Sequence, residues 1–131
     1  MKSLIIGGAL ALSVFLGGCG IHPHNTVKTP TDAGHPLVNL SSSIFLGSQT
    51  VTIKTGQTIS FKEPTTGGMH VLLAGLHGAP QPQTGAPTAL NAPNGIAVYA
   101  GQIHTVTFTQ PGTYHITALY HDAMQLTVIV K

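Results

Sequence analysis

Short apolar stretches separated by glycine and proline run through residues 37–131, and they constrain the fold more than any other feature of the chain. Within residues 50–55 and 58–62 every second side chain is apolar, which is the period of a strand with one buried face. Residues 70–75, HVLLAG, hold a continuous apolar run that is typical of a strand buried on both faces. No stretch has a convincing helical period. The pattern predicts an all-β domain, a Greek-key β-sandwich of about seven or eight strands.

Two connections are predicted from their turn residues. Residues 104–120, HTVTFTQPGTYHITALY, predict a hairpin that turns at Pro111-Gly112. Residues 75–93 are rich in glycine and proline, so we expect a long loop without helix there.

Side-chain parity fixes the register of the predicted hairpin. Inward residues must face inward residues, because a slip of one residue turns a whole buried set outward. The matching register pairs Val106 with Ile116, and it places His104 directly across from Ala118. Directly opposed residues have Cβ atoms about 5 Å apart, so two roles are open for His104. Its imidazole either reaches into the space beside Ala118 as a ligand or fills that space as a half-exposed packing residue at the start of a strand.

The beginning of the chain predicts export and lipid anchoring. Residues 1–18 combine a lysine, an apolar run and small residues, as in a secretory signal peptide. Leu16–Cys19 form the motif LGGC, which resembles a bacterial lipobox and implies cleavage before Cys19 and acylation of that residue. Residues 19–36 have the composition of a flexible tether. We therefore expect a protein of the cell envelope, anchored in the outer membrane or on the outer face of the cell membrane.

Composition excludes several classes of function. The chain has five Lys and Arg residues against three Asp and Glu, so it lacks the clustered positive charge of a nucleic-acid binder. So few acidic residues make paired-carboxylate catalysis improbable, and no nucleophile elbow or phosphate loop is present, so we expect no enzyme. The single cysteine, Cys19, excludes a disulfide and a copper–thiolate bond within an acylated chain.

Ligand-capable side chains gather near the end of the sequence. His121 follows Ala118 by three residues, and Met124 follows His121 by three. Such positions converge on one point if the loop between two strands curls through a turn, and a residue of a neighbouring strand, His70 in GGMHVLLAG, can close the cavity. Imidazole and thioether groups suit copper.

These motifs resemble the copper site of cupredoxins over roughly residues 37–131. Pro111-Gly112-Thr113-Tyr114 is similar to the turn that opens the ligand strand, and the spacing of Ala118, His121 and Met124 is similar to the short ligand loop of amicyanin-like members. The resemblance implies a cupredoxin-type fold with copper ligands at His70, His121 and Met124. The family's ligand cysteine is replaced by Ala118, and His104 is a candidate replacement ligand.

The remaining histidines are expected to lie elsewhere. His77 follows His70 by seven residues, mostly strand, so we expect it about 20 Å away at the other pole of the domain. His115 has the wrong parity to face inward. His22, His24 and His35 lie on the predicted tether.

Three functions remain open. The first is a non-blue copper-binding protein with His and Met ligands, for copper capture or delivery at the envelope, with a copper-transfer partner. The second is an electron carrier with an atypical copper site and a redox partner. The third is a metal-free β-sandwich that binds a partner through residues 75–93.

Overall fold

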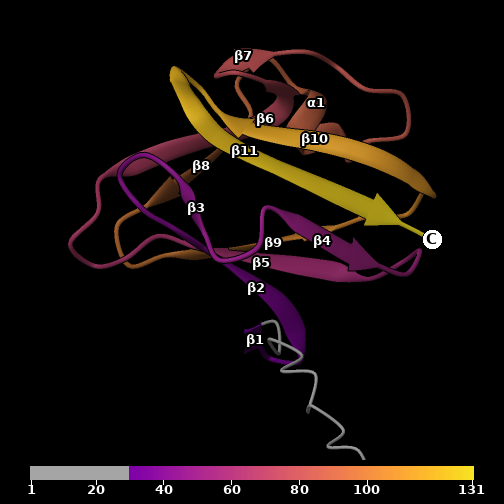
Figure 1. Ribbon diagram of the computed structural model, residues 1–131, viewed down its shortest axis with the longest axis horizontal. Helices are drawn as coiled ribbons and strands as arrows, with labels where there is room; N and C mark the ends of the chain where they lie inside the picture. Colours follow the sequence, from indigo (N-terminus) through magenta and orange to yellow (C-terminus); the bar gives the residue numbers. More distant parts are fainter. Residues whose placement is uncertain (1–29) are drawn as a thin grey trace, which may run out of the picture.

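The computed structural model describes residues 30–131, which form two packed β-sheets with eleven strands among them (Figure 1). One sheet has the order β1-β2-β5-β9, with β3 paired to β2. The other has the order β4-β11-β10-β6-β7, with β8 paired to β6. The strands of the first sheet are β1 (Thr31–Asp32), β2 (His35–Leu40), β3 (Phe45–Leu46), β5 (Thr58–Lys62) and β9 (Ile103–Thr107). Those of the second are β4 (Thr50–Ile53), β6 (Met69–Leu76), β7 (Ala79–Pro80), β8 (Ile96–Tyr99), β10 (Gly112–Ala118) and β11 (His121–Val130).

The β-sandwich predicted from the sequence is confirmed. It has more strands than the seven or eight expected, because three strands of only two residues each, β1, β3 and β7, are added. Two pairings are parallel, β2 with β5 and β4 with β11, and the other pairings are antiparallel. No helix in residues 30–131 is long and apolar enough to span a membrane.

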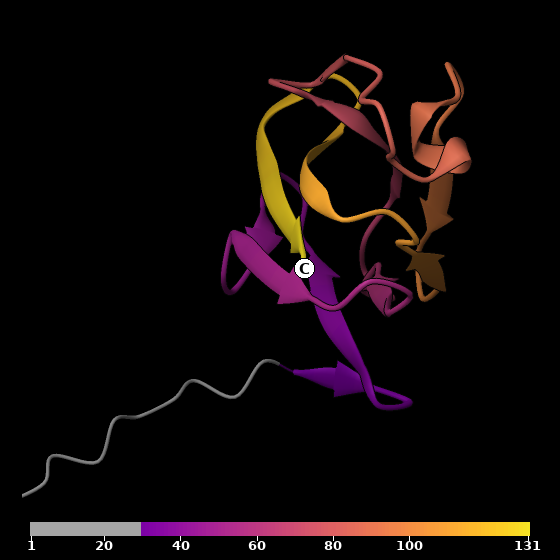
Figure 2. The ribbon, with the colours of Figure 1, turned by 90° about the vertical axis from the view of Figure 1, so that its right-hand side faces the viewer.

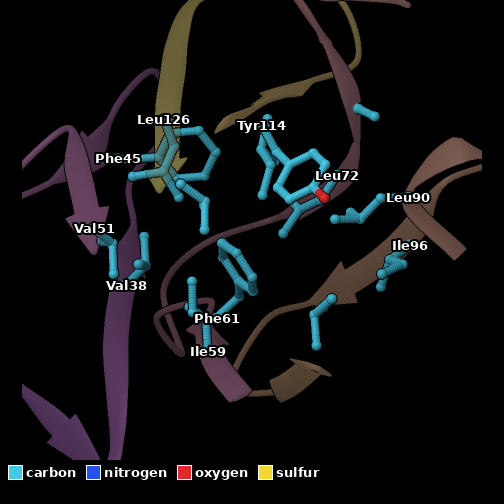
Figure 3. Packing of buried hydrophobic residues seen from close by; sticks show 14 of the residues in the cluster. Val38, Phe45, Val51, Ile59, Phe61, Leu72, Leu90, Ile96, Tyr114 and Leu126 are labelled. Carbon is cyan, nitrogen blue, oxygen red and sulfur yellow. The ribbon is translucent and has the colours of Figure 1, made fainter. Parts of the chain in front are cut away.

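The core lies between the two sheets and is built from the alternating residues that the sequence predicts. Side chains of both layers point into this space, among them Phe61 and Ile59 from β5 and Leu72 and Tyr114 from the opposite sheet (Figure 3). Val51 and Ile53 are also buried, so the alternation expected in residues 50–55 is confirmed. In β6 the run from Leu72 to Gly75 is buried throughout, as expected for a strand covered on both faces.

The hairpin predicted in residues 104–120, with its turn at Pro111-Gly112, does not form. β9 pairs with β5 in the first sheet, whereas β10 pairs with β6 and β11 in the second. The Pro111-Gly112 segment therefore carries the chain from one sheet to the other. The Tyr114 hydroxyl donates a hydrogen bond of 2.9 Å to the Gln110 carbonyl and braces this crossing.

Two other segments differ from the sequence predictions. The loop at 75–93 contains a one-turn helix, α1 (Thr88–Asn91), which is too short to show a helical period. The helix lies at the edge of the sandwich (Figure 2), where it contacts β6. Residues 31–36 pair in the β1–β2 hairpin, although the sequence places them in the tether. Ala33 and Gly34, with φ values of 47° and 81°, supply the left-handed turn of that hairpin.

Candidate metal centre

The turn between β10 and β11 brings Ala118 and His121 face to face. These two residues pair across the hairpin, and Leu119 and Tyr120 make the turn. Tyr120 has a left-handed φ of 65°, and its N–H donates a hydrogen bond of 2.9 Å to the Gly78 carbonyl. Ala118 is fully buried on the inward side of β10, with Tyr114 and Ile116. The three-residue spacing noted in the sequence is thus that of a tight hairpin.

Met124 enters the core through an irregularity of the same hairpin. The register of β10 and β11 shifts between Thr117, which pairs with Gln125, and Ala118, which pairs with His121. Asp122 and Ala123 are exposed in this interval, while Met124 is fully buried within the apolar cluster. The bulge lets the chain expose two residues and then return the thioether to the interior.

His70 meets His121 at this end of the sandwich. His70 lies near the start of β6, pairs with Val98 of β8 and is only 4% exposed. Its ring centroid is 4.8 Å from that of the partly buried His121, and the two rings are tilted by 57°. These two imidazoles are 51 positions apart in the sequence. The Leu119 N–H donates a hydrogen bond of 2.8 Å to the Val71 carbonyl, and this bond holds the hairpin turn against β6.

Glu63 is a buried member of this cluster that the sequence does not single out. Its Oε2 is 2.8 Å from His70 Nδ1, and its side chain is fully buried. The turn between β8 and β9 holds its backbone, since the Glu63 N–H bonds the Gln102 carbonyl at 3.0 Å and the Glu63 carbonyl accepts from Gly101 at 3.1 Å. The available signal was a rare acidic residue placed directly after a strand.

The position expected for His104 depended on the hairpin and is wrong. His104 lies on β9, where it pairs with Phe61 of β5, and it is exposed. Ala118 instead has Leu72 and His121 as its paired neighbours, in the other sheet. The inward-facing Val106 of β9 pairs with Ile59 of β5, and not with Ile116 as predicted.

His77, which the sequence places about 20 Å from His70 at the other pole of the domain, lies beside the turn that carries His121. Its Nδ1 is 2.9 Å from Asp122 Oδ1, and Asp122 is the neighbour of His121 in sequence. The chain reverses at His77-Gly78, whose φ values are 53° and 71°, and the Gly78 N–H donates to Thr117 Oγ1 at 2.9 Å. The β6–β7 hairpin thus bends towards the β10–β11 turn, whereas the prediction assumed a straight strand.

Of the remaining histidines, His35 and His115 lie within the described residues 30–131. His115 is only partly buried, and its inward neighbours Tyr114 and Ile116 are buried, so the parity prediction is confirmed. His35 is partly buried on β2. Cys19, His22 and His24 lie outside the described residues.

Within residues 30–131, no group of three or more His, Cys, Asp or Glu side chains is placed to hold a metal ion. The candidate centre therefore consists of two adjacent imidazoles, a buried thioether on the same hairpin, and a carboxylate hydrogen-bonded to one imidazole. Two nitrogen donors and a soft sulfur donor are the ligand types that copper accepts in proteins.

This fold and this pair of histidines define a small β-sandwich with a candidate metal centre at one end. No family model and no curated protein matches the sequence. Among solved structures, amicyanin from Paracoccus versutus is 22% identical with a TM-score of 0.56, and the match covers 77% of this chain and 85% of that one. The reduced Cu(I) form of an amicyanin mutant at pH 4 is 19% identical with a TM-score of 0.57, covering 77% and 86%. The chain therefore has a cupredoxin-like fold.

Proposed function

We propose that this protein binds copper through His70, His121 and Met124 and serves in copper capture or delivery at the cell envelope. The observation that carries the proposal is the 4.8 Å approach of the His70 and His121 rings at the end of a cupredoxin-like sandwich. His121 also pairs across the turn with the buried Ala118, which stands where the resemblance expects a copper ligand.

The chemistry of the donor set fits copper without a thiolate. Imidazole suits both Cu(I) and Cu(II), and the thioether of Met124 favours Cu(I). Copper bound by these residues would show no charge transfer from a thiolate, because Ala118 has no sulfur atom. The chain's own residues provide the donors, and the burial of His70 and Met124 limits the access of water.

The test is titration of the purified protein with Cu(I) and Cu(II), with electron paramagnetic resonance of the Cu(II) form. We expect one tightly bound copper ion and a spectrum with nitrogen ligands. His70→Ala and His121→Ala should each weaken binding, whereas His115→Ala on the same sheet should not. Failure to bind copper, or binding that survives the loss of both histidines, would overturn the proposal and favour a metal-free module.

Electron transfer is the second candidate, and the likeness to amicyanin favours it. Solved amicyanin structures include a reduced Cu(I) form and an oxidized form. The absence of a thiolate among the described residues weakens this candidate, because the thiolate tunes the potential and the electronic coupling of a blue copper site. Rapid and reversible reduction of the copper-loaded protein by a small electron donor would favour it over capture or delivery.

A further inference from the structure

Strand β9 has one edge without a partner strand in the described part of the chain. It is the last strand of the first sheet, and it pairs with β5 alone. We propose that two copies of this protein associate through this edge, with the two β9 strands antiparallel in one continuous sheet. The inference concerns association of the chain and is independent of the proposed copper function.

Two backbone hydrogen bonds at the ends of β9 show which of its residues face β5. The Phe108 N–H donates to the Gln57 carbonyl, and the Glu63 N–H donates to the Gln102 carbonyl, each at 3.0 Å. In an antiparallel pair, residues that exchange hydrogen bonds with the neighbouring strand alternate with residues that do not. The even-numbered residues of β9 therefore bond β5, and the odd-numbered residues point their N–H and carbonyl groups away from it.

The odd-numbered residues of β9 are Ile103, Thr105 and Thr107, and all three are exposed. Among the described residues, no other segment donates to or accepts from their backbone groups. An exposed row of free N–H and carbonyl groups is a template for a further strand. Proteins often protect such an edge with a charged side chain or a proline, and β9 contains neither.

Other strands of the sandwich have free positions that side chains close. At the start of β4, Ser48 Oγ accepts from the Thr50 N–H and donates to the Thr50 carbonyl. In β10, the Gln83 side-chain amide does the same for His115, with both hydrogen bonds at 2.8 Å. The edge of β9 therefore remains open where these strands are closed.

The free groups are symmetric about Thr105, which favours a second copy over an unrelated strand. A two-fold axis at Thr105 places this residue opposite its own counterpart, and it places Ile103 opposite Thr107 of the second copy. Each outward N–H then meets an outward carbonyl, so every free backbone group of the strand is paired.

Charge does not oppose this contact. Acidic and basic side chains are equal in number within residues 30–131, so this part of the chain has no net charge when its histidines are neutral. The charged residues are Lys54, Lys62, Lys131, Asp32, Glu63 and Asp122. A net charge near zero favours association. One strand of five residues gives a small interface, so the dimer should be weak and reversible.

The first experiment measures association by sedimentation velocity, with the purified full chain in a neutrally buoyant detergent over a range of protein concentrations. We expect a reversible dimer in the wild type. Thr105→Lys and Thr105→Glu should each raise the dissociation constant by at least about tenfold, because like charges would lie opposite each other across the axis. Thr52→Lys is the matched control, since Thr52 is an exposed strand residue of the other sheet, and it should leave the constant unchanged.

An equimolar mixture of the two charged variants tests the two-fold axis. It should associate more tightly than either variant alone, because opposite charges would then face each other.

The second experiment reads the register by disulfide formation under mild oxidation. The Cα atoms of a directly opposed, hydrogen-bonded pair are about 5.5 Å apart, which is within the range of a disulfide, so Thr105→Cys should give a linked dimer. Thr107→Cys is the control, because the two copies of residue 107 would be offset by about 13 Å along the strands. Both variants retain Cys19, so a link through that residue would appear in both.

The outcomes decide the proposal without reference to copper. A wild type that stays monomeric at every concentration overturns it and leaves the edge to a strand of a different protein. A dimer that persists unchanged in both charged variants also overturns it, since the contact would then lie elsewhere. If a charged variant does not fold, the cysteine variants still decide, because equal yields of linked dimer from Thr105→Cys and Thr107→Cys would contradict an axis at Thr105.

Discussion

At the scale of single residues, Ala118 determines how a bound copper ion would absorb light. Its side chain is fully buried, and the residue pairs across the turn with His121, so a sulfur atom at this position would lie close to His121. We predict that the wild type stays colourless or pale with Cu(II), whereas Ala118→Cys turns blue or green through charge transfer from the thiolate. Visible absorption spectra of the copper-loaded proteins provide the measurement.

Ala123→Cys is the matched control, because Ala123 lies on the same hairpin but is exposed. It should not give the intense band. A folded Ala118→Cys protein that remains colourless would mean that the histidines and the new thiol do not converge.

Met124 offers a second test at this scale, because its thioether is buried and is a soft donor. Met124→Leu conserves volume and should cost less than about 1.5 kcal/mol of stability. We predict that it weakens Cu(I) binding more than Cu(II) binding, measured by competition with chelators of each ion. Met69→Leu, at a half-exposed position, should change neither. Equal effects on both ions would make Met124 a packing residue.

The residues of the candidate centre were predictable to different degrees. The contact between His70 and His121 was predictable from the spacing of Ala118, His121 and Met124. That spacing indicated a turn between two strands, and the strand of His70 was expected to lie beside this turn. The pairing of Glu63 with His70 was not predictable. It depends on the β8–β9 turn, whose backbone hydrogen bonds fix the position of Glu63, and this contact joins segments far apart in the sequence. A sequence shows an acidic residue but does not show which of its neighbours lacks a hydrogen-bond partner.

At the scale of elements, the placement of β9 removes the reason for assigning His104 to the centre. β9 belongs to the sheet that does not contain Ala118, and His104 is exposed there. We predict that His104→Ala leaves copper affinity and the number of nitrogen ligands unchanged, as read from titration and electron paramagnetic resonance. His121→Ala is the positive control. A clear loss of affinity in His104→Ala would show that this side chain reaches the metal after all.

The turn between β10 and β11 provides a stability test. Tyr120 is 89% exposed and has a φ of 65°, so it occupies a left-handed conformation with few packing contacts to offset the strain. Tyr120→Gly should therefore be more stable than Tyr120→Ala by about 1 kcal/mol. Urea unfolding of both variants measures the difference, and the alanine variant controls for loss of the ring. Equal midpoints would mean that the backbone at this position is not strained.

The strands themselves were predictable, whereas one of their pairings was not. Apolar alternation identified the inward residues of β4, β5 and β10, because burial imposes a period of two. The same parity rule is satisfied whether Val106 pairs with Ile116, as predicted, or with Ile59, as observed. Local pattern therefore fixes which face is buried, but the choice of partner depends on the packing of both sheets.

At the scale of the whole molecule, the remaining hypothesis concerns attachment to the envelope through Cys19. We predict that Cys19→Ser moves the protein from the detergent phase to the aqueous phase when cell extracts are partitioned with a cloud-point detergent, because the acyl chains would be absent. Gly20→Ser, which keeps the cysteine, should stay in the detergent phase. Aqueous partitioning of the wild type would refute the anchor.

The β1–β2 hairpin sets how far such an anchored domain could travel. The first strand of the described residues is β1, at Thr31, whereas the sequence predicts a domain that starts at residue 37. A chain extends by at most about 3.6 Å per residue, so the roughly twelve residues from an acylated Cys19 would span no more than about 43 Å. The domain would then be confined to a thin layer above the lipid surface, and any donor or acceptor of its copper would have to enter that layer.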